Sequence, residues 1–498
     1  MVRIVYATFM NYVFSFVEAV ISFLFVVLII RRLSFSDFAN WILITTYISY
    51  VLFLAAICDY WIPRYVARGV NVSKTGIVLM LLLGLAATAV YSVVGYALAL
   101  TFGHDIVATL LASFIVLLIF LNRGLNSIVI GTKPQFATLC LLVQRATQLA
   151  VAVLMVYYLR FGVRGVVVAA IAGWCASCMV LYSITRKYIS ESKINYEIMV
   201  LWIKRAWIPL YTSISGTLMA LDYTVMRYIT GSDEVIALYG AGATFTKAIA
   251  LTAQAMPALY AGMLKDARGE YLYHALWAMY LVAIPLTTFI YFNSKLIAAL
   301  LGVKYVKLGP VLPLFATMYI VYITHTAITA VFTGLERREL GTVSSRELLK
   351  TALFKNPTVN AVVNVAYLAT LALTVMFVRE LGVFTVVLLW VLLSTTRYLV
   401  QIVLKEYLLR KDFKFRTNYL LISKYLAKFT LLSVLCCLVV NLIPVEYSTS
   451  IWKITHSLLM RGIPYTLLYV SITYLVDARF RLLCLRAVNI LIPSKIHR

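Results

Sequence analysis

Acidic residues are scarce in this sequence, and so are charged residues of any kind. Asp and Glu number only 19 among 498 residues, and all charged residues together make up 13% of the chain, whereas a soluble domain carries about 25%. Apolar residues make up 63%, which is more than one buried core can hide. The surplus must face lipid, and the composition therefore excludes a soluble enzyme and a disordered chain.

Long polar stretches are absent as well. A membrane-spanning helix needs roughly 20 apolar residues, and about 14 such helices leave no room for a soluble domain. The apolar runs predict helices at residues 6–30, 38–58, 76–101, 106–121, 136–159, 165–185, 206–230, 235–262, 271–292, 308–332, 357–378, 381–404, 424–443 and 458–476. Helices satisfy every backbone polar group within lipid. The sequence thus predicts an all-α polytopic membrane protein.

Signatures of catalysis and of metal binding are missing too. The chain has no G-x-x-x-x-G-K-[ST] sequence for ATP hydrolysis. Cys175 and Cys178 form a C-x-x-C pair, but it lies in an apolar run with no second pair nearby, whereas a zinc site usually needs four ligands. The predicted outer loops are short and hold few carboxylates. We predict that the protein is no enzyme and that it has no cofactor or metal ion.

Basic residues, by contrast, are abundant, and the net charge is +25. In a soluble protein this charge would suggest nucleic acid, but here it sits in inter-helix loops, where it fits membrane topology and anionic lipids. The predicted inner loops and both termini carry 29 Lys and Arg, and the outer loops carry 10. Because cytoplasmic loops are enriched in these residues, we predict a plasma-membrane protein with both termini in the cytoplasm and no nucleic-acid partner.

A faint internal repeat suggests how the helices are grouped. The pattern R-x-x-x-x-S-D ends the first predicted helix at residues 31–37 and the seventh at residues 227–233, and in both places it leads into the next helix. Pro and Gly residues recur in matching order after both copies: Pro63 and Pro257, Gly131 and Gly334, and Gly162 and Gly382. We predict two pseudo-symmetric six-helix lobes at 1–190 and 191–405, related by an axis along the membrane normal. Two further helices and a cytoplasmic tail would occupy 406–498.

Polar residues inside the predicted helices mark candidate binding positions, because they should face protein or water rather than lipid. Four neutral side chains are expected to line a hydrated cavity between the lobes: Asn11, Gln148, Gln254 and Asn364. Four basic side chains would favour an anionic head group there: Arg145, Lys247, Arg397 and His325. Two carboxylates, Glu18 and Asp222, are the candidates for coupling to H⁺ or Na⁺.

Structural explanations for these residues stay open. Ser, Thr and Asn at helical spacing also serve inter-helix hydrogen bonding. Glu18 could form a structural ion pair with either Arg145 or Lys247, and Asp222 could pair with Arg227, although a spacing of five residues is imperfect on a helix.

Three short segments connect the chain to a known family. They are Ile29 to Phe38, which leads into the second helix, Ile62 to Arg68 after it, and the stretch from Leu221-Asp222 through Met226-Arg227 to Gly240. Together with the helix count, they resemble the polysaccharide transporters, or O-antigen (lipid-linked oligosaccharide) flippases. This family belongs to the multidrug/oligosaccharidyl-lipid/polysaccharide exporter superfamily. Its members often have Gly after the acidic-aromatic pair, where this chain has Ala39-Asn40.

The resemblance implies a two-lobe transporter that alternates between inward-open and outward-open states. Its substrate would be a polyprenyl-pyrophosphate-linked oligosaccharide, moved from the inner to the outer leaflet, and membrane lipids, H⁺ or Na⁺ would be its other partners. We expect a monomer. Two alternatives remain: an ion-coupled exporter of drugs or metabolites from the same superfamily, and a scaffold that transports nothing.

Overall fold

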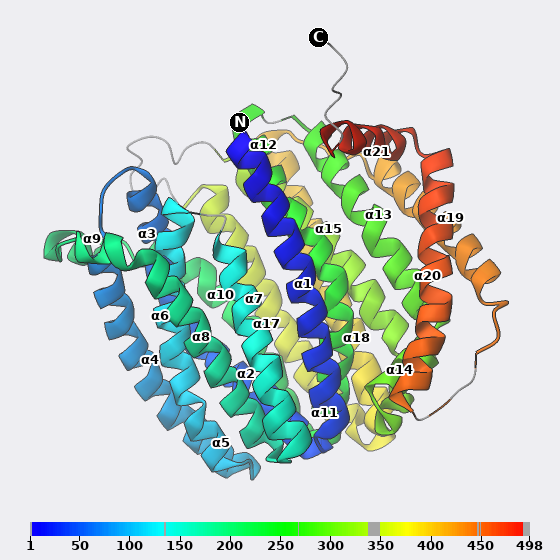
Figure 1. Ribbon diagram of the computed structural model, residues 1–498, viewed down its shortest axis with the longest axis horizontal. Coiled ribbons are helices and arrows are strands. Elements are labelled where there is room, and N and C mark those ends of the chain that lie inside the picture. The colour runs from blue at the N-terminus through cyan, green and yellow to red at the C-terminus, as the bar shows by residue number, and fades with distance from the viewer. Residues whose placement is uncertain are drawn as a thin grey trace. The chain divides into compact units, whose positions relative to one another are not determined.

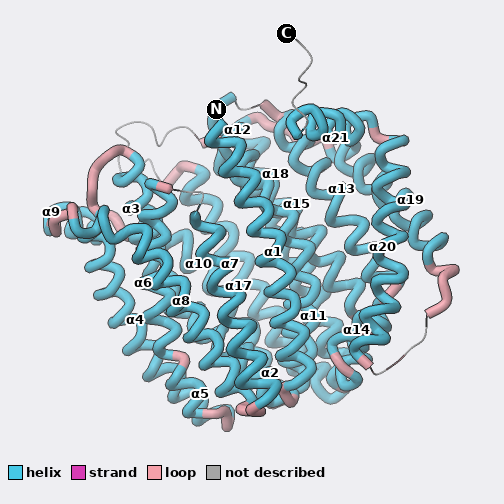
Figure 2. Tube along the Cα trace, in the orientation of Figure 1, coloured by secondary structure: helices cyan, strands magenta, loops and turns pink. Residues whose placement is uncertain are grey.

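The computed structural model describes residues 2–133, 136–266, 268–336, 349–445, 448 and 450–491. Every regular element in these residues is helical (Figure 2). By length and apolar composition, twelve helical segments of the described chain can cross a membrane: Phe35–Val66, Ser73–Phe102, Ile106–Thr132, Thr138–Tyr158, Gly162–Ser190, Asp233–Ala253, Glu270–Phe292, Leu312–Gly334, Ala352–Leu381, Val383–Phe413, Tyr419–Val440 and Ile451–Val476. The prediction of an all-α polytopic membrane protein is confirmed.

The chain divides into two compact units. The first contains Met1–Phe245 and Thr342–Arg397, and the second contains Thr246–Gly341 and Tyr398–Arg498. The helix α18 (Val383–Phe413) carries the chain from one unit into the other without a break. These units are defined by contacts, whereas the lobes at 1–190 and 191–405 are inferred from sequence symmetry, and that symmetry stays a prediction.

Unit 1 is built mainly from helices of the N-terminal half of the chain, together with α17 and the first part of α18 (Figure 1). Their bounds are α1 (Val2–Arg32), α2 (Phe35–Val51), α3 (Ala56–Ala67), α4 (Ser73–Phe102), α5 (Ile106–Leu111), α6 (Ser113–Thr132), α7 (Ala137–Ala152), α8 (Gly162–Ser190), α9 (Tyr196–Lys204), α10 (Trp207–Thr230), α11 (Asp233–Thr246) and α17 (Ala352–Val378). Short 3₁₀ and π segments, η1 (Leu52–Ala55), η3 (Val153–Tyr158) and η7 (Arg379–Leu381), continue three of them.

Unit 2 contains the 3₁₀ segment η4 (Lys247–Ala255) and the helices α12 (Met256–Asp266), α13 (Glu270–Phe292), α14 (Ser294–Leu301), α15 (Leu312–Gly334), α19 (Tyr419–Val440), α20 (Ile451–Val476) and α21 (Ala478–Leu491). A further 3₁₀ segment, η5 (Val303–Leu308), links α14 to α15.

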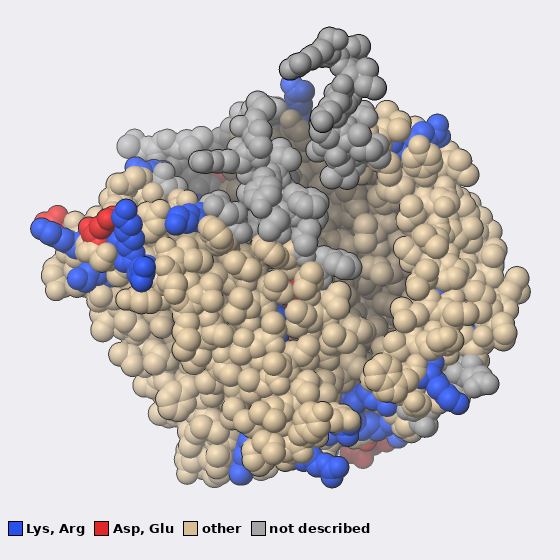
Figure 3. Space-filling view, viewed as in Figure 1, with Lys and Arg blue, Asp and Glu red and all other residues tan. Residues whose placement is uncertain are grey.

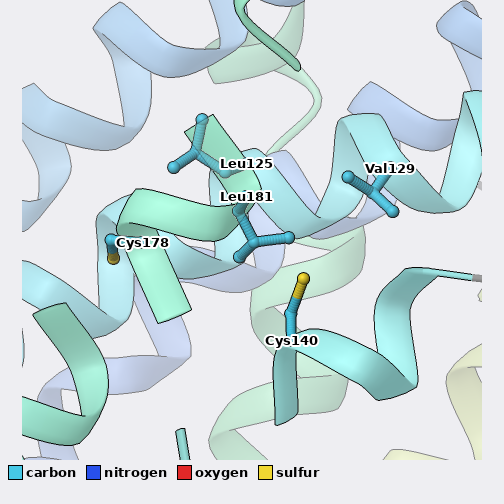
Figure 4. Packing of buried hydrophobic residues seen from close by; sticks show 5 residues of the cluster. All are labelled: Leu125, Val129, Cys140, Cys178 and Leu181. Carbon is cyan, nitrogen blue, oxygen red and sulfur yellow. The ribbon is translucent and has the colours of Figure 1, made fainter. Parts of the chain in front are cut away.

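The helices of unit 1 pack through apolar faces and leave other apolar faces outside. Cys140 and Cys178 are buried beside Leu125, Val129 and Leu181, where α6, α7 and α8 meet (Figure 4). These cysteines are free thiols in an apolar core. On α4, the side chains of Leu85 and Val93 are 56% and 71% exposed. Charged side chains are sparse over this flank and gather around α9 (Figure 3). Such an exposed apolar flank is what a lipid-facing surface requires.

Gly173 allows α8 to lie close to α7. A Cβ atom at this position would lie 2.7 Å from the backbone oxygen of Gln144 and 3.0 Å from Cβ of Gln148. We expect Gly173→Ala to destabilise the protein by about 1–3 kcal/mol, because the two backbones must separate. Gly216 on α10 is the matched control, since a Cβ there meets nothing within 4 Å. Gly216→Ala should be neutral or slightly stabilising. Thermal unfolding of both variants checks this, and equal midpoints would contradict it.

Three short helices were not predicted from the sequence. The helices α9 and α14 lie in segments for which the sequence predicts loops, and α21 lies in the predicted cytoplasmic tail. With 9, 8 and 14 residues, they are shorter than the apolar run that identifies a span. Conversely, α1 and α10 form where the first and seventh spans are predicted, but they are not among the twelve segments. The number of fourteen spans therefore stays a prediction.

Candidate functional site

A cavity of about 750 Å³ opens among η4, α12 and α15 of unit 2. It forms where the helix predicted over 235–262 is broken, because the nine residues of η4 are wound as a 3₁₀ helix between α11 and α12. A 3₁₀ stretch of this length is uncommon and often marks a functional position. The polar residues of the lining include Lys247, Tyr260, Tyr322, His325, Thr326 and Thr329. Among the described residues that line this cavity, none is Asp or Glu.

Two of the predicted cationic residues thus come together. Lys247 is exposed at the start of η4, and His325 lies on α15. Gln254 also belongs to η4, but its side chain lies outside the described residues. The hydroxyl and ammonium groups of this lining can donate hydrogen bonds, and they suit an anionic or heavily hydroxylated ligand.

Behind His325 lies a lysine that the sequence analysis missed. Lys405 of α18 is fully buried, with its Nζ 2.8 Å from Nε2 of His325. Its Nζ also donates to Oγ1 of Thr329, at 2.7 Å. No carboxylate in the described part of the chain lies within ion-pair distance of this Nζ. The structure therefore places a second amine directly against the residues that line the cavity.

Lys405 was missed because the predicted helix ended at residue 404, immediately before it. The sequence assigned a helix to 381–404 and a loop to the residues after it, whereas α18 continues to Phe413. Arg397, Gln401 and Lys405 follow one another at a spacing of four residues, and all three are buried. If the predicted helix is extended by one turn, Lys405 falls on the same helix face as Arg397 and Gln401.

In unit 1, Glu18 forms an ion pair with Arg145, which is one of the two partners that the sequence allows. The Nε atom of Arg145 lies 3.4 Å from Oε1 of Glu18, and this oxygen also accepts a hydrogen bond from Ser22. Nη1 of Arg145 donates to Oε1 of Gln148, at 3.0 Å. The side chains of Glu18 and Arg145 are 22% and 37% exposed. The cluster joins α1 to α7 and keeps part of the guanidinium accessible.

Asp222 lies in an enclosed aromatic site of unit 1. Its Oδ2 accepts hydrogen bonds from the Tyr367 hydroxyl at 3.1 Å and from Nε1 of Trp390 at 3.2 Å. Its Oδ1 accepts from the backbone N–H of Tyr223. The ring of Trp390 stacks on Tyr239 with centroids 3.6 Å apart. These donors come from α10, α17 and α18 and hold the carboxylate in one place.

The remaining predicted residues occupy separate places in unit 1. The guanidinium of Arg397 lies 4.8 Å from the ring centre of Tyr367, so it approaches the Asp222 site. The amide of Asn364 donates to the backbone oxygen of Ser215 and thereby links α17 to α10. Asn11 lies on α1, but its side chain is outside the described residues.

Arg227 does not pair with Asp222. Its Nε lies 3.1 Å from Oδ1 of Asp233, and its Nη2 donates to the backbone oxygen of Phe102. Asp105 accepts a hydrogen bond from the backbone N–H of Ala108, so it caps the start of α5. The described residues contain no group of three His, Cys, Asp or Glu side chains that could hold a metal ion.

Comparisons with known proteins give the fold a context. No protein-family model matches the chain, and no curated protein matches it. Its fold is similar to that of the lipid II flippase MurJ in an inward closed conformation, with a TM-score of 0.67 at 16% identity over 93% of this chain and 98% of that chain.

Two other solved structures are similar over about four fifths of the chain. An inward-facing multidrug resistance MATE family transporter of the MOP superfamily gives a TM-score of 0.59 at 15% identity, covering 80% of this chain and 96% of that one. A MOP superfamily transporter from Pyrococcus furiosus, for which reversed polarity of the binding pocket suggests a different function, gives 0.54 at 14% identity, covering 80% and 92%. The fold of the chain is therefore similar to that of MurJ and of the MATE transporters.

Proposed function

We propose that this protein is a flippase that moves a polyprenyl-pyrophosphate-linked oligosaccharide from the inner to the outer leaflet of the plasma membrane by alternating access. The observation that carries the proposal is the basic cavity of unit 2, whose described lining offers Lys247 and His325 without a carboxylate. A pyrophosphate head group needs such cations and hydrogen-bond donors. Both termini would lie in the cytoplasm, as the distribution of Lys and Arg favours.

The similarity to MurJ supports a lipid-linked substrate, because it extends over 93% of this chain. A second cavity adds support. It has a volume of about 650 Å³ and is lined almost wholly by apolar and aromatic residues of α13 and α20, among them Leu281, Phe289, Ile463 and Tyr469. A surface of this kind suits the isoprenoid chain of the substrate.

An ion-coupled exporter of drugs or metabolites is the alternative, since MATE transporters share the fold. A site for organic cations would require acidic residues, and the described lining of the unit 2 cavity holds none. Coupling to H⁺ or Na⁺ through Glu18 or Asp222 is compatible with either function.

The proposal is tested by replacing Lys247 with methionine. We expect Lys247→Met to reduce translocation of a fluorescent prenyl-pyrophosphoryl sugar in proteoliposomes by tenfold or more, on the order of one lost charge-assisted contact to phosphate. The variant should keep its thermal stability, because Lys247 is exposed. Lys295→Met is the matched control, since Lys295 is an exposed lysine of unit 2 that does not line the cavity.

Translocation by Lys247→Met at the wild-type rate would reject the cavity as the binding site. Stabilisation of the purified protein by organic cations, without any effect of the prenyl-pyrophosphoryl sugar, would favour the exporter.

A further inference from the structure

The amine of Lys405 is in an unusual situation for a charged group. It is fully buried, and its described hydrogen bonds are to the imidazole of His325 and the hydroxyl of Thr329. No described carboxylate lies close enough to balance a positive charge on this amine. A buried ammonium without a counter-ion is strongly unfavourable because it has lost its hydration. The charge of this amine must therefore depend strongly on what stands in the adjacent cavity.

The hydrogen bonds restrict how many protons the pair can hold. The hydroxyl of Thr329 donates to the backbone oxygen of His325, so its oxygen accepts from Nζ of Lys405. The 2.8 Å contact between Nζ of Lys405 and Nε2 of His325 requires one hydrogen and one lone pair. Two fully protonated groups could not make it. The pair therefore exists either neutral or with one added proton shared between Nζ and Nε2.

We propose that the Lys405–His325 pair takes up one proton from water when a pyrophosphate group binds in the unit 2 cavity, and releases it when that group leaves. This inference rests on the proposed function and adds to it a site where protons and substrate are linked. An anion next to His325 supplies the missing counter-charge, so anion binding and protonation of the pair favour each other by the same factor. The site needs no carboxylate, unlike the coupling through Glu18 or Asp222 that the sequence suggests.

The other titratable groups around the pair do not provide this proton. Lys247 is exposed to solvent on the cavity wall, unlike the buried amine of Lys405. Glu406 follows Lys405 on α18, but its carboxylate accepts hydrogen bonds from Arg410, one turn further along α18, and from Thr417, just before α19. The described titratable neighbours also include tyrosines, which are ordinarily neutral near pH 7: Tyr260 and Tyr322 in the lining, Tyr398 against the His325 ring, and Tyr280, which bonds Thr324.

The test measures proton uptake during binding. The full chain in lipid nanodiscs is titrated with farnesyl-pyrophosphoryl N-acetylglucosamine in two buffers of different ionisation enthalpy, because the difference in measured heat gives the number of protons bound. Each phosphorus of this probe carries one ester link, one anhydride link and a single strongly acidic hydroxyl, so both stay ionised near neutral pH and the probe itself takes up no proton. The wild type should take up about one proton per ligand, and its affinity should rise by up to tenfold for each unit that the pH falls.

Two variants locate the proton. Lys405→Met keeps the length of the side chain without an amine, and Lys405→Arg supplies a cation that is always protonated. Both should bind the probe with little pH dependence and with proton uptake close to zero. Lys295→Met, outside the cavity, should behave as the wild type. Thermal unfolding establishes that each variant is folded.

Three outcomes are decisive. Binding by the wild type without proton uptake overturns the inference and leaves the proposed function standing. Undiminished uptake in folded Lys405→Met or Lys405→Arg likewise overturns the inference. Absence of binding to the folded wild type overturns both the inference and the proposed function.

Discussion

Replacing Asp222 with alanine is expected to lower the free energy of unfolding by about 3–5 kcal/mol, the range seen when one member of a buried charged network is removed. The carboxylate accepts from Tyr367, from Trp390 and from the backbone N–H of Tyr223, and it is 5% exposed. Its loss leaves the buried donors of Tyr367 and Trp390 without their charged acceptor. It also removes a negative charge from the site that the guanidinium of Arg397 approaches. The midpoint of thermal unfolding in detergent measures the effect.

Asp222→Asn separates charge from shape at the same position. The amide keeps the size of the side chain and one acceptor oxygen, so its destabilisation should be smaller than that of Asp222→Ala. Equal and negligible effects of both variants would show that the aromatic site does not depend on the carboxylate. If Asp222 instead couples transport to H⁺ or Na⁺, as the sequence suggests, Asp222→Asn should abolish the dependence of translocation on the ion gradient while the protein stays folded.

The helices could be predicted from the sequence because lipid imposes a simple rule. An apolar run of sufficient length must close its own backbone hydrogen bonds, and the predicted segments are helical in the structure. The short helices follow a different rule. The α9 helix is only 9 residues long and is held by the buried Trp202, whose ring packs against Tyr65 from a distant part of the chain. No local pattern reports that contact.

The polar residues could be found, but not their partners. Asp222 stands out in an apolar helix, yet its partners Tyr367 and Trp390 are 145 and 168 positions away. The sequence pattern does not indicate that the Tyr367 hydroxyl and the Trp390 indole point toward Asp222. Only the packing of α10 against α17 and α18 turns them into hydrogen-bond donors for a carboxylate. The sequence likewise does not decide whether Glu18 pairs with Arg145 or with Lys247, because the choice depends on the packing of α1 against α7.

Lys428 and Arg461 show that an intramembrane charge is not by itself evidence of a binding site. Arg461 donates to the backbone oxygens of Asn441 and Ile443 and to the side chain of Asn293, and so it holds the start of the loop between α19 and α20. Lys428 bonds Asp477, at 2.7 Å. Lys247 differs from both, because it faces a cavity and the described structure gives it no acidic partner.

The strongest effect in unit 2 is expected at Asp477. Its Oδ2 accepts from Nζ of Lys428 and from Nε1 of Trp277, while its Oδ1 accepts from the backbone N–H of Phe480 at the start of α21. One carboxylate thus ties α21 to α13 and α19. Asp477→Ala should destabilise the protein by about 2–4 kcal/mol, because it removes both a helix cap and a charged acceptor.

The pH dependence of the unfolding midpoint shows whether the negative charge of Asp477 causes the stabilisation. Burial alone would raise the pKa of Asp477, but the hydrogen bonds from Lys428, Phe480 and Trp277 outweigh it and hold the pKa below its ordinary value of 3.8. Because the pKa of Asp477 is lower in the folded than in the unfolded protein, its ionised carboxylate stabilises the fold fully at any pH above the unfolded-state pKa. This stabilisation is lost as the pH falls through the folded-state pKa. Asp477→Asn keeps a good helix cap without the charge. Its unfolding midpoint should lie below that of the wild type by a constant amount from neutral pH to about pH 5, and the gap should close below about pH 4. A gap that stayed unchanged in acid would assign the stabilisation to shape and capping rather than to the ion pair.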